Sequence, residues 1–210
     1  MTKDWLSWHD DYDRPGSALA ARLAEVREQV RAALDRAPDG PLRVVSACAG
    51  QGRDLIPVLA AHPRRDDVTA RLVELDPRNV ALAEDAVRAA GLTGVQVVAG
   101  DAAVTDAYAD LAPADLVLFC GVFGNVSDAD IRATVAHCAA LCASGGTVIW
   151  TRHRGEPDLV PTICDWFAQE GFAQVAVSTP ADLVGVGVHR LVGEPRPLQR
   201  GVTMFRFLTG

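Results

Sequence analysis

Residues 42–60 read LRVVSACAGQGRDLIPVLA, and this stretch decides the fold. A valine-rich apolar run is followed by the small residues ACAGQG (47–52) and then by a helical pattern that begins near Arg53. Small residues at such a turn let a ligand approach the backbone, and free N–H groups at a helix start favour an anionic group. A tight strand-to-helix connection without a ligand is the alternative at this point.

Short apolar runs and helical patterns alternate after this stretch. The predicted strands are LRVVSA (42–47), ARLVEL (70–75), VQVVA (95–99), ADLVLFC (114–120) and GTVIWTR (146–152). Helical patterns cover residues 53–62, 77–90, 128–143 and 157–170. The runs are apolar almost throughout, as strands covered on both faces require. The sequence therefore predicts an α/β fold with a parallel sheet and right-handed crossovers.

The two ends of the chain follow other patterns. After Ser17, an amphipathic helix is predicted from apolar residues at spacings of three and four: Leu19, Leu23, Val26, Val30 and Leu34. The last strand-like runs are FAQVAVS (172–178), VGVHRLVG (186–193) and VTMFRFL (202–208), with no long helix between them, which predicts an antiparallel edge. We expect one domain over residues 1–210, with a helical cap or lid over 1–38 and a cofactor-binding core over 39–210.

Composition excludes several classes of protein. The 210 residues include 49% hydrophobic residues, enough for a sizeable core, and their net charge is −7. An acidic chain without a Lys/Arg block argues against nucleic-acid binding. No apolar run reaches the roughly 18–20 residues that span a bilayer, so we expect a cytoplasmic protein without a membrane partner. Five cysteines without a CxxC pair predict no metal site.

Two carboxylates follow strands of the predicted sheet, where ligands of open parallel sheets bind. Glu74 lies about twenty residues beyond the glycine turn, where a carboxylate can accept hydrogen bonds from ribose hydroxyls. Asp101 follows the third run and could accept from an adenine amine, or could equally be a turn or cap aspartate. Together they indicate an adenosine-bearing ligand, without distinguishing NAD from other adenosyl cofactors.

Five motifs, in order, are VVSACAGQG, VELDPRN, VVAGDA, ADLVLFCGVFGNV and LCASGGTVIW. As a set over residues 40–210 they resemble the motif series of class I S-adenosylmethionine-dependent methyltransferases. The resemblance implies a Rossmann-like, doubly wound seven-stranded sheet of order 3-2-1-4-5-7-6 with an antiparallel last strand. Residues 202–208 fit that strand, paired with 186–192. The first motif differs from the usual VLDLGCGTG, because Ser46 replaces the acidic residue and Cys48 the first glycine.

The resemblance also implies the residues that hold S-adenosylmethionine and its product, S-adenosylhomocysteine. Ala49, Gly50 and Gly52 would line the methionine and ribose portion, and Asp54 would supply part of the charge missing at Ser46. Glu74 would hold the ribose hydroxyls, with Leu75 against the adenine. Asp101 and Ala102 would contact the adenine edge, and the backbone at Cys120, Gly121 and Val122 would accept from the cofactor's amino group.

Acceptor-side residues are predicted near the sulfonium, because methyl transfer needs alignment, exclusion of water and, for some nucleophiles, a base. Trp8 and Tyr12 are candidate walls of a lid and His9 a candidate base; the alternative is a hydrophobic staple. Phe123 and Asn125 are candidate acceptor contacts, although Asn125 could instead cap the following helix.

Two further histidines are candidate bases. Strict alternation puts His189 on the face of Gly185 and Gly187, opposite Val186 and Val188, so we expect it to face the pocket or solvent. His153 follows the fifth run and is a candidate base or a surface histidine.

The function predicted from these features is methyl transfer from S-adenosylmethionine to a small-molecule acceptor at O, N or C. Residues 121–126 (GVFGNV) lack the Asn/Asp-Pro-Pro-Tyr/Phe pattern of enzymes that methylate bases, and we expect no nucleic-acid partner. A monomer or homodimer is expected. Two alternatives are a methyltransferase-fold protein that uses bound cofactor without methyl transfer, cyclase-like or non-catalytic, and a NAD(P)-linked oxidoreductase. The turn AGQGRD departs from the GxGxxG typical of NAD enzymes.

Overall fold

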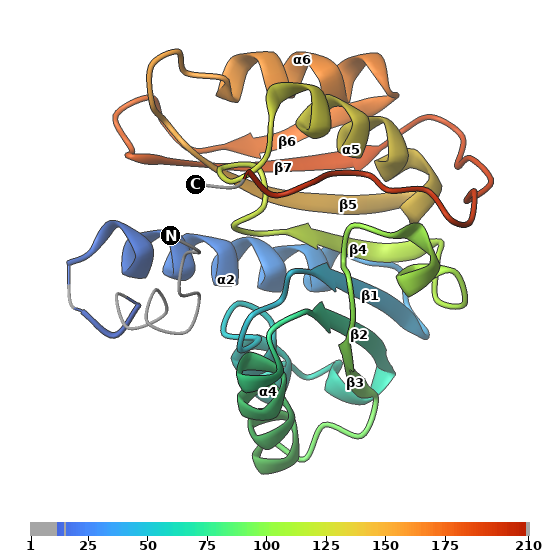
Figure 1. Ribbon diagram of the computed structural model, residues 1–210. Helices are drawn as coiled ribbons and strands as arrows, with labels where there is room; N and C mark the ends of the chain where they lie inside the picture. Colours follow the sequence, from blue (N-terminus) through green and yellow to red (C-terminus); the bar gives the residue numbers. More distant parts are fainter. Residues whose placement is uncertain (1–11, 15, 209–210) are drawn as a thin grey trace.

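A computed structural model describes residues 12–14 and 16–208. The chain forms a seven-stranded sheet of order β3-β2-β1-β4-β5-β7-β6 with helices on both faces (Figure 1). This confirms the predicted Rossmann-like fold class and strand order. β1 is parallel to β2 and β4, and the parallel part extends to β3 and β5. β7 is antiparallel to both β5 and β6, which confirms the antiparallel edge.

The strands and helices have the following bounds. The strands are β1 Leu42–Ala47, β2 Val68–Glu74, β3 Val95–Ala99, β4 Ala114–Phe119, β5 Cys142–His153, β6 Phe172–Val177 and β7 Val184–Leu191. The α-helices are α2 Ala18–Arg36, α3 Ile56–Ala61, α4 Pro77–Ala89, α5 Asp128–Leu141 and α6 Val160–Gln169. Two short 3-10 helices are η2 Arg65–Asp67 and η3 Thr105–Tyr108.

The core forms two layers, one on each face of the sheet. Alternate residues of β1 separate cleanly: Val44 packs with α2, α3 and α4, whereas Val45 packs with α5 and α6. Because both faces are covered, the inner strands are buried almost throughout, which explains their continuous apolar runs.

Local sequence explains where the helices begin. Ser17 caps α2, its hydroxyl oxygen accepting from the Ala20 N–H at 3.0 Å. The helix predicted over residues 53–62 is shorter in the structure, because residues after Gly52 first form a turn. The Gly52 carbonyl accepts from both Leu55 and Ile56, at 3.2 and 2.9 Å, and α3 begins only at Ile56.

The last strand is β7, so the assignment of residues 202–208 to it was wrong. β7 uses both its edges, one for β5 and one for β6, and no edge is left for a further strand. The segment forms only two isolated bridges, Val104 with Thr203 and Val126 with Phe207.

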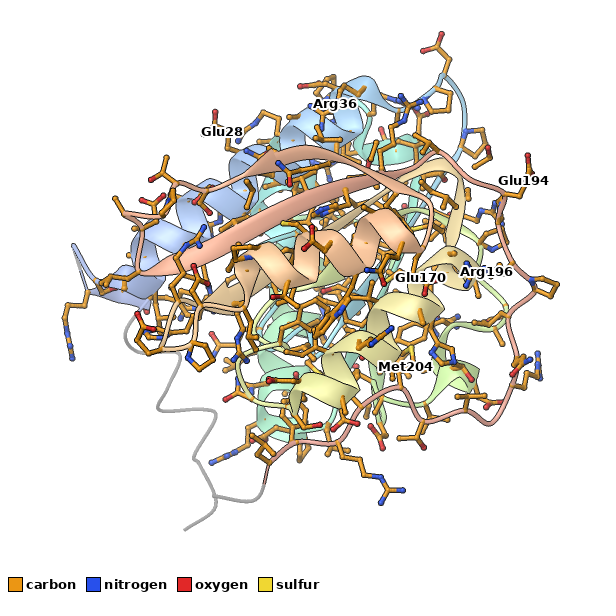
Figure 2. All side chains as sticks on the ribbon, turned by 90° about the horizontal axis from the view of Figure 1, so that it is seen from above. Glu28, Arg36, Glu170, Glu194, Arg196 and Met204 are labelled. Atoms are coloured by element: carbon orange, nitrogen blue, oxygen red, sulfur yellow. The ribbon has the colours of Figure 1, made fainter. Side chains whose placement is uncertain are left out.

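The C-terminal segment instead crosses the α5 side of the molecule. The Thr134 hydroxyl of α5 donates to the Met204 carbonyl at 3.2 Å, and Met204 is buried. Arg196, in the preceding loop, pairs with Glu170 at 2.7 Å, and Figure 2 shows these two side chains beside each other. The segment that ends at Leu208 is therefore held by contacts spread along its length.

Candidate functional site

A cavity of about 570 Å³ lies where the predicted site is expected, beyond the carboxyl ends of the parallel strands. Its walls come from the loops after β1, β2, β3 and β4, from α2, and from the C-terminal segment. The lining residues are Tyr12, Arg22, Leu23, Val26, Cys48, Ala49, Gly50, Gln51, Arg53, Asp54, Glu74, Leu75, Asp76, Pro77, Arg78, Asn79, Asp101, Ala102, Cys120, Gly121 and Phe207. The cavity thus gathers polar side chains from segments far apart in the sequence.

Glu74, the last residue of β2, joins two of these loops. Its Oε2 accepts from the Gly50 N–H at 2.8 Å, and its Oε1 accepts from the Asp76 N–H at 2.9 Å. Hydrogen bonds to an ionised carboxylate are stronger than neutral ones. Each oxygen can accept more than one hydrogen bond. Glu74 therefore holds the loop after β1 in place and can still accept a hydrogen bond from a hydroxyl group in the cavity.

The loop after β1 has a left-handed backbone at three alternate residues. Cys48, Gly50 and Gly52 have φ values of 52°, 55° and 68°. At Gly52 a Cβ would lie 2.4 Å from Ile56 Cδ1 and 2.9 Å from Leu72 Cδ2, so glycine lets α3 pack against β2. Cys48 adopts the same conformation although it has a side chain, and burial raises the pKa of its thiol. The thiol is therefore neutral.

The loop after β3 supplies Asp101 and Ala102. The exposed Asp101 lines the cavity, and its Oδ1 accepts from the Ala103 N–H at 2.9 Å, so it makes a turn as well. The Ala102 carbonyl accepts from the buried Tyr108 hydroxyl at 2.7 Å. Across the opening, Leu75 is 71% exposed and offers an apolar surface to a flat ring.

A cluster of titratable side chains lies at the part of the cavity lined by α2. Arg22 is buried, hydrogen-bonds the Tyr12 hydroxyl, and places its guanidinium carbon 5.3 Å from the Tyr12 ring centroid. Burial raises the pKa of Tyr12 to about 12. Burial also raises the pKa of Asp54, and the nearby charge of Arg22 opposes this rise. Asp54 Oδ1 is buried and has no hydrogen-bond partner among the described residues.

Most predicted cofactor residues meet at this cavity. Those that line it are Ala49, Gly50, Asp54, Glu74, Leu75, Asp101, Ala102, Cys120 and Gly121. Gly52 instead packs beneath the loop, and Val122 is fully buried in the core. Their roles toward a cofactor stay predictions.

The predicted acceptor residues are scattered. Tyr12 lines the cavity, while Trp8 and His9 lie outside the described residues. Phe123 is wholly buried, with ring centroids 5.9 Å from Phe119 and 5.8 Å from Trp150. The Asn125 side chain donates to the Gly121 carbonyl at 2.7 Å, and Ser127, not Asn125, caps α5. Asn125 therefore braces the loop after β4.

His189 does not face the cavity or solvent, so that expectation was wrong. The alternation along β7 is as predicted, but α6 covers the face that carries His189. Its ring lies 4.4 Å from Phe167 and 6.0 Å from Trp150 between centroids, and the Trp150 Nε1–H donates to its Nδ1 at 3.1 Å. Burial lowers the pKa of His189 to about 4. It is a neutral core residue.

His153 lies at the end of β5 and is exposed. It borders a separate hollow of about 210 Å³ together with Arg152, Gly124 and Glu156. This position agrees with the surface alternative.

Sequence reasoning missed several lining residues. Arg22 carried a signal, because it lies three residues after Leu19 and four before Val26, on the apolar face of a helix. The sequence predicted for Arg53 only that a helix begins near it. In the structure Arg53 lines the cavity and forms a salt bridge with Asp13 at 2.7 Å. Phe207 carried no such signal, since the path of the C-terminal segment depends on long-range contacts.

Neither a metal-ligand cluster nor a membrane-spanning helix occurs among the described residues. No group of three or more His, Cys, Asp or Glu side chains is placed to hold a metal ion in this part of the chain. Within the same residues, every helix is too short or too polar to cross a membrane.

Known proteins resemble this chain in sequence, through one family profile, and in fold, through solved structures. The sequence profile of a family described as "Putative methyltransferase" matches residues 17–171. No curated protein sequence matches the chain.

Solved structures share its fold. Magnesium protoporphyrin IX methyltransferase from Synechocystis PCC 6803, solved with bound S-adenosylmethionine, has a TM-score of 0.67 at 15% identity, covering 90% of this chain and 91% of that one. An O-methyltransferase family protein from Burkholderia thailandensis has a TM-score of 0.64 at 18% identity over 82% of this chain, which spans 56% of that longer protein. At such identities the similarity shows the Rossmann-like fold of class I methyltransferases.

Proposed function

Because the chain belongs to the methyltransferase family whose profile spans residues 17–171, we propose that it transfers a methyl group from S-adenosylmethionine to a small-molecule acceptor. The observation that carries the proposal is the cavity of about 570 Å³ with Glu74 bonded to the Gly50 amide at its wall. The same opening brings together the loops after four parallel strands, where ligands of this fold class bind.

The described residues fit an adenosyl sulfonium cofactor. Glu74 offers acceptor capacity to ribose hydroxyls, Leu75 an apolar face to adenine, and Asp101 an acceptor for the adenine amine. Near α2, the buried and unpartnered Asp54 Oδ1 suits a cationic group. When bound, S-adenosylmethionine supplies a methyl group activated by the positive sulfur.

The chain contributes position and exclusion of water. Tyr12 lines the cavity and is joined to Arg22, and its neighbour Asp13 pairs with Arg53, so residues 12–13 are tied to the cavity wall. In-line transfer gains most from holding the two reactants aligned in a dry site. Among the described residues no histidine lines the cavity. A base from β5 or β7 has no part in this proposal, and His9 stays a prediction.

Calorimetry with the purified protein tests the proposal. We expect micromolar binding of S-adenosylmethionine and S-adenosylhomocysteine and no binding of NAD or NADP. Transfer is then followed with methyl-labelled cofactor against a panel of small hydroxyl, amine and carbon acceptors. Tight NAD binding without adenosyl-sulfonium binding would overturn the proposal. Cofactor binding without transfer to any acceptor class would favour the non-transferring alternative.

A further inference from the structure

The C-terminal segment, residues 202–208, is attached to the loops after two strands that are not neighbours in the sheet. The Met204 N–H donates to the Ala103 carbonyl, after β3, at 2.8 Å. The Leu208 N–H donates to the Asn125 carbonyl, after β4, at 2.9 Å. Two strands, β2 and β1, lie between β3 and β4 in the sheet. The segment therefore leads from the loop after β3 to the loop after β4.

Phe207 is the residue of this segment that reaches the cavity. It lines the cavity together with Gly121 and is 41% exposed, whereas Met204 and Phe205 are each 1% exposed. Its ring meets the Phe205 ring edge to face, with centroids 5.7 Å apart and an angle of 83° between the planes. Buried neighbours thus anchor the segment, and one of its rings forms part of the cavity surface.

Asn125 connects the segment to the cavity wall. Its backbone carbonyl accepts from the Leu208 N–H, and its side-chain amide donates to the Gly121 carbonyl at 2.7 Å. The Gly121 N–H in turn donates to the Thr151 hydroxyl of β5 at 2.8 Å. A series of hydrogen bonds therefore positions Phe207 against the loop after β4 before any ligand binds. Binding to such a preformed wall costs less ordering of the protein.

Strand order places Phe207 on the side of the cavity away from Glu74 and Leu75. Phe207 bridges to Val126, after β4, whereas Glu74 and Leu75 lie at the end of β2, and β1 lies between these two strands. A cofactor whose adenosine contacts Glu74 and Leu75 directs its sulfonium toward the loops after β1 and β4. Phe207 therefore borders the space in which the methyl acceptor has to lie.

The chemistry of the Phe207 side chain restricts what it can recognise. A phenylalanine ring carries no charge and no hydrogen-bonding group, so it contributes apolar area and ring-to-ring contact. Tyr12 is the other aromatic residue among the described residues of the lining. Its ring centroid lies 5.3 and 5.8 Å from the guanidinium carbons of Arg22 and Arg53. Phe207 is thus the wall that best suits a flat, uncharged ring.

We propose that Phe207 binds the acceptor and that the acceptor carries an aromatic ring, which packs against Phe207 with its nucleophilic atom toward the methyl group. This inference rests on the proposed function and names its substrate class. In the transfer, an electron pair of the nucleophile forms the new bond to the methyl carbon while the carbon–sulfur bond breaks and leaves its electron pair on sulfur. A proton displaced from the nucleophile passes to solvent.

Matched pairs of fragments test the substrate class. The probes are phenol with cyclohexanol, and 2-naphthol with decahydro-2-naphthol, titrated by NMR into the full chain saturated with S-adenosylhomocysteine. Each aromatic fragment should bind roughly tenfold more tightly than its saturated counterpart, because only the aromatic one makes a ring-to-ring contact. Equal affinities within both pairs, or no binding of either aromatic fragment, would overturn the inference. Failure of S-adenosylhomocysteine itself to bind would instead remove the proposed function.

Variants of Phe207 then test the residue. Phe207→Leu keeps an apolar side chain but removes the ring, so it should weaken 2-naphthol roughly tenfold and leave S-adenosylhomocysteine within about twofold. Phe207→Tyr keeps the ring and should retain 2-naphthol binding.

The matched control is Leu208→Ala. Leu208 is 64% exposed and does not line the cavity, so neither ligand should change in affinity. Unchanged 2-naphthol binding in Phe207→Leu would show that the ring does not contact the acceptor. An equal loss of S-adenosylhomocysteine and 2-naphthol in Phe207→Leu would place Phe207 at the cofactor or in a structural role. Either result would overturn the assignment.

Discussion

Asp54 and His189 show the same abnormality in two different regions of the molecule. Each has a buried polar atom, Oδ1 and Nε2, that has no hydrogen-bond partner among the described residues. Asp54 borders the cavity at the end of the parallel strands, whereas His189 is enclosed by the rings of Trp150 and Phe167 between β7 and α6. An unpartnered polar atom points to a ligand only where a cavity reaches it.

Burial shifts the pKa values of the two groups in opposite directions for one reason. It raises the pKa of Asp54 and lowers the pKa of His189 to about 4, because the charged form of each is disfavoured. Asp54 has Arg22 beside it, and a ligand cation can restore its charge. His189 has aromatic neighbours and stays neutral. The comparison predicts that the His189 region governs stability and the Asp54 region governs binding.

Gly187→Ala should have the largest effect, on stability. A Cβ at this position would lie 2.3 Å from Trp150 Cε2 and Cζ2, in the layer that also holds His189. Overpacking against a rigid indole should lower the free energy of unfolding by about 3 kcal/mol. Urea denaturation measures the change. Gly124→Ala is the control, since a Cβ there has nothing within 4 Å. An equally small loss of stability in Gly187→Ala and Gly124→Ala would contradict tight packing around Trp150.

Acid should destabilise the protein through His189. The pKa of His189 is about 4 in the folded protein against 6.5 as the ordinary value, so the unfolded chain binds the proton first as the pH falls. The contribution of the neutral His189 to the free energy of unfolding is therefore fully present above about pH 6.5. It is lost as the pH falls toward 4, by up to about 3 kcal/mol. Denaturation curves from pH 7 to 4 should be flatter for His189→Phe than for the unmodified chain. Parallel curves would contradict the neutral buried histidine.

Glu74→Ala tests the other region through binding. It removes the acceptor of the Gly50 and Asp76 N–H groups and the acceptor expected for ribose hydroxyls. Affinity for S-adenosylhomocysteine should fall by about 1–3 kcal/mol, measured by calorimetry. Glu84→Ala, on the exposed side of α4, is the control and should leave affinity unchanged. An unaltered affinity in Glu74→Ala would refute its role.

Cys48→Gly should have the smallest effect. Cys48 has φ of 52°, a conformation that costs a residue with a side chain about 1 kcal/mol. Glycine relieves that cost but loses the contact of the side chain with the core, so thermal unfolding should show a gain of at most about 1 kcal/mol. Cys48→Ala keeps the strain and removes the thiol. If the Cys48→Ala variant were more stable than the Cys48→Gly variant, backbone strain at residue 48 would not govern the stability change.

The fold and much of the cavity followed from local patterns. The continuous apolar runs predicted the parallel strands, and β1 and β3 have the predicted bounds. Glu74, Asp101 and the glycine turn meet because parallel strands carry their loops to one edge of the sheet. Such features depend on neighbours in sequence and on rules common to all sheets.

The failures concern residues whose surroundings come from distant segments. Phe123 follows a strand as predicted, yet its ring is buried against Trp150 from the next strand. His189 obeys the alternation of β7, which tells which face a side chain lies on but not that α6 covers this face. Phe207 was not predicted as a site residue for the same reason, because the segment that carries it is placed by contacts with distant residues.

The amino-acid sequence alone determined the order of strands and helices, the parallel sheet and the loops at which a ligand could bind. Those properties arise from hydrophobic periodicity and from the restricted backbone of small residues, which act over a few positions. Long-range packing decided that β7, not residues 202–208, completes the sheet, that His189 is core, and that Arg22 on α2 faces Asp54. Burial and charge pairing depend on which distant segments cover a residue, and local pattern does not contain that information.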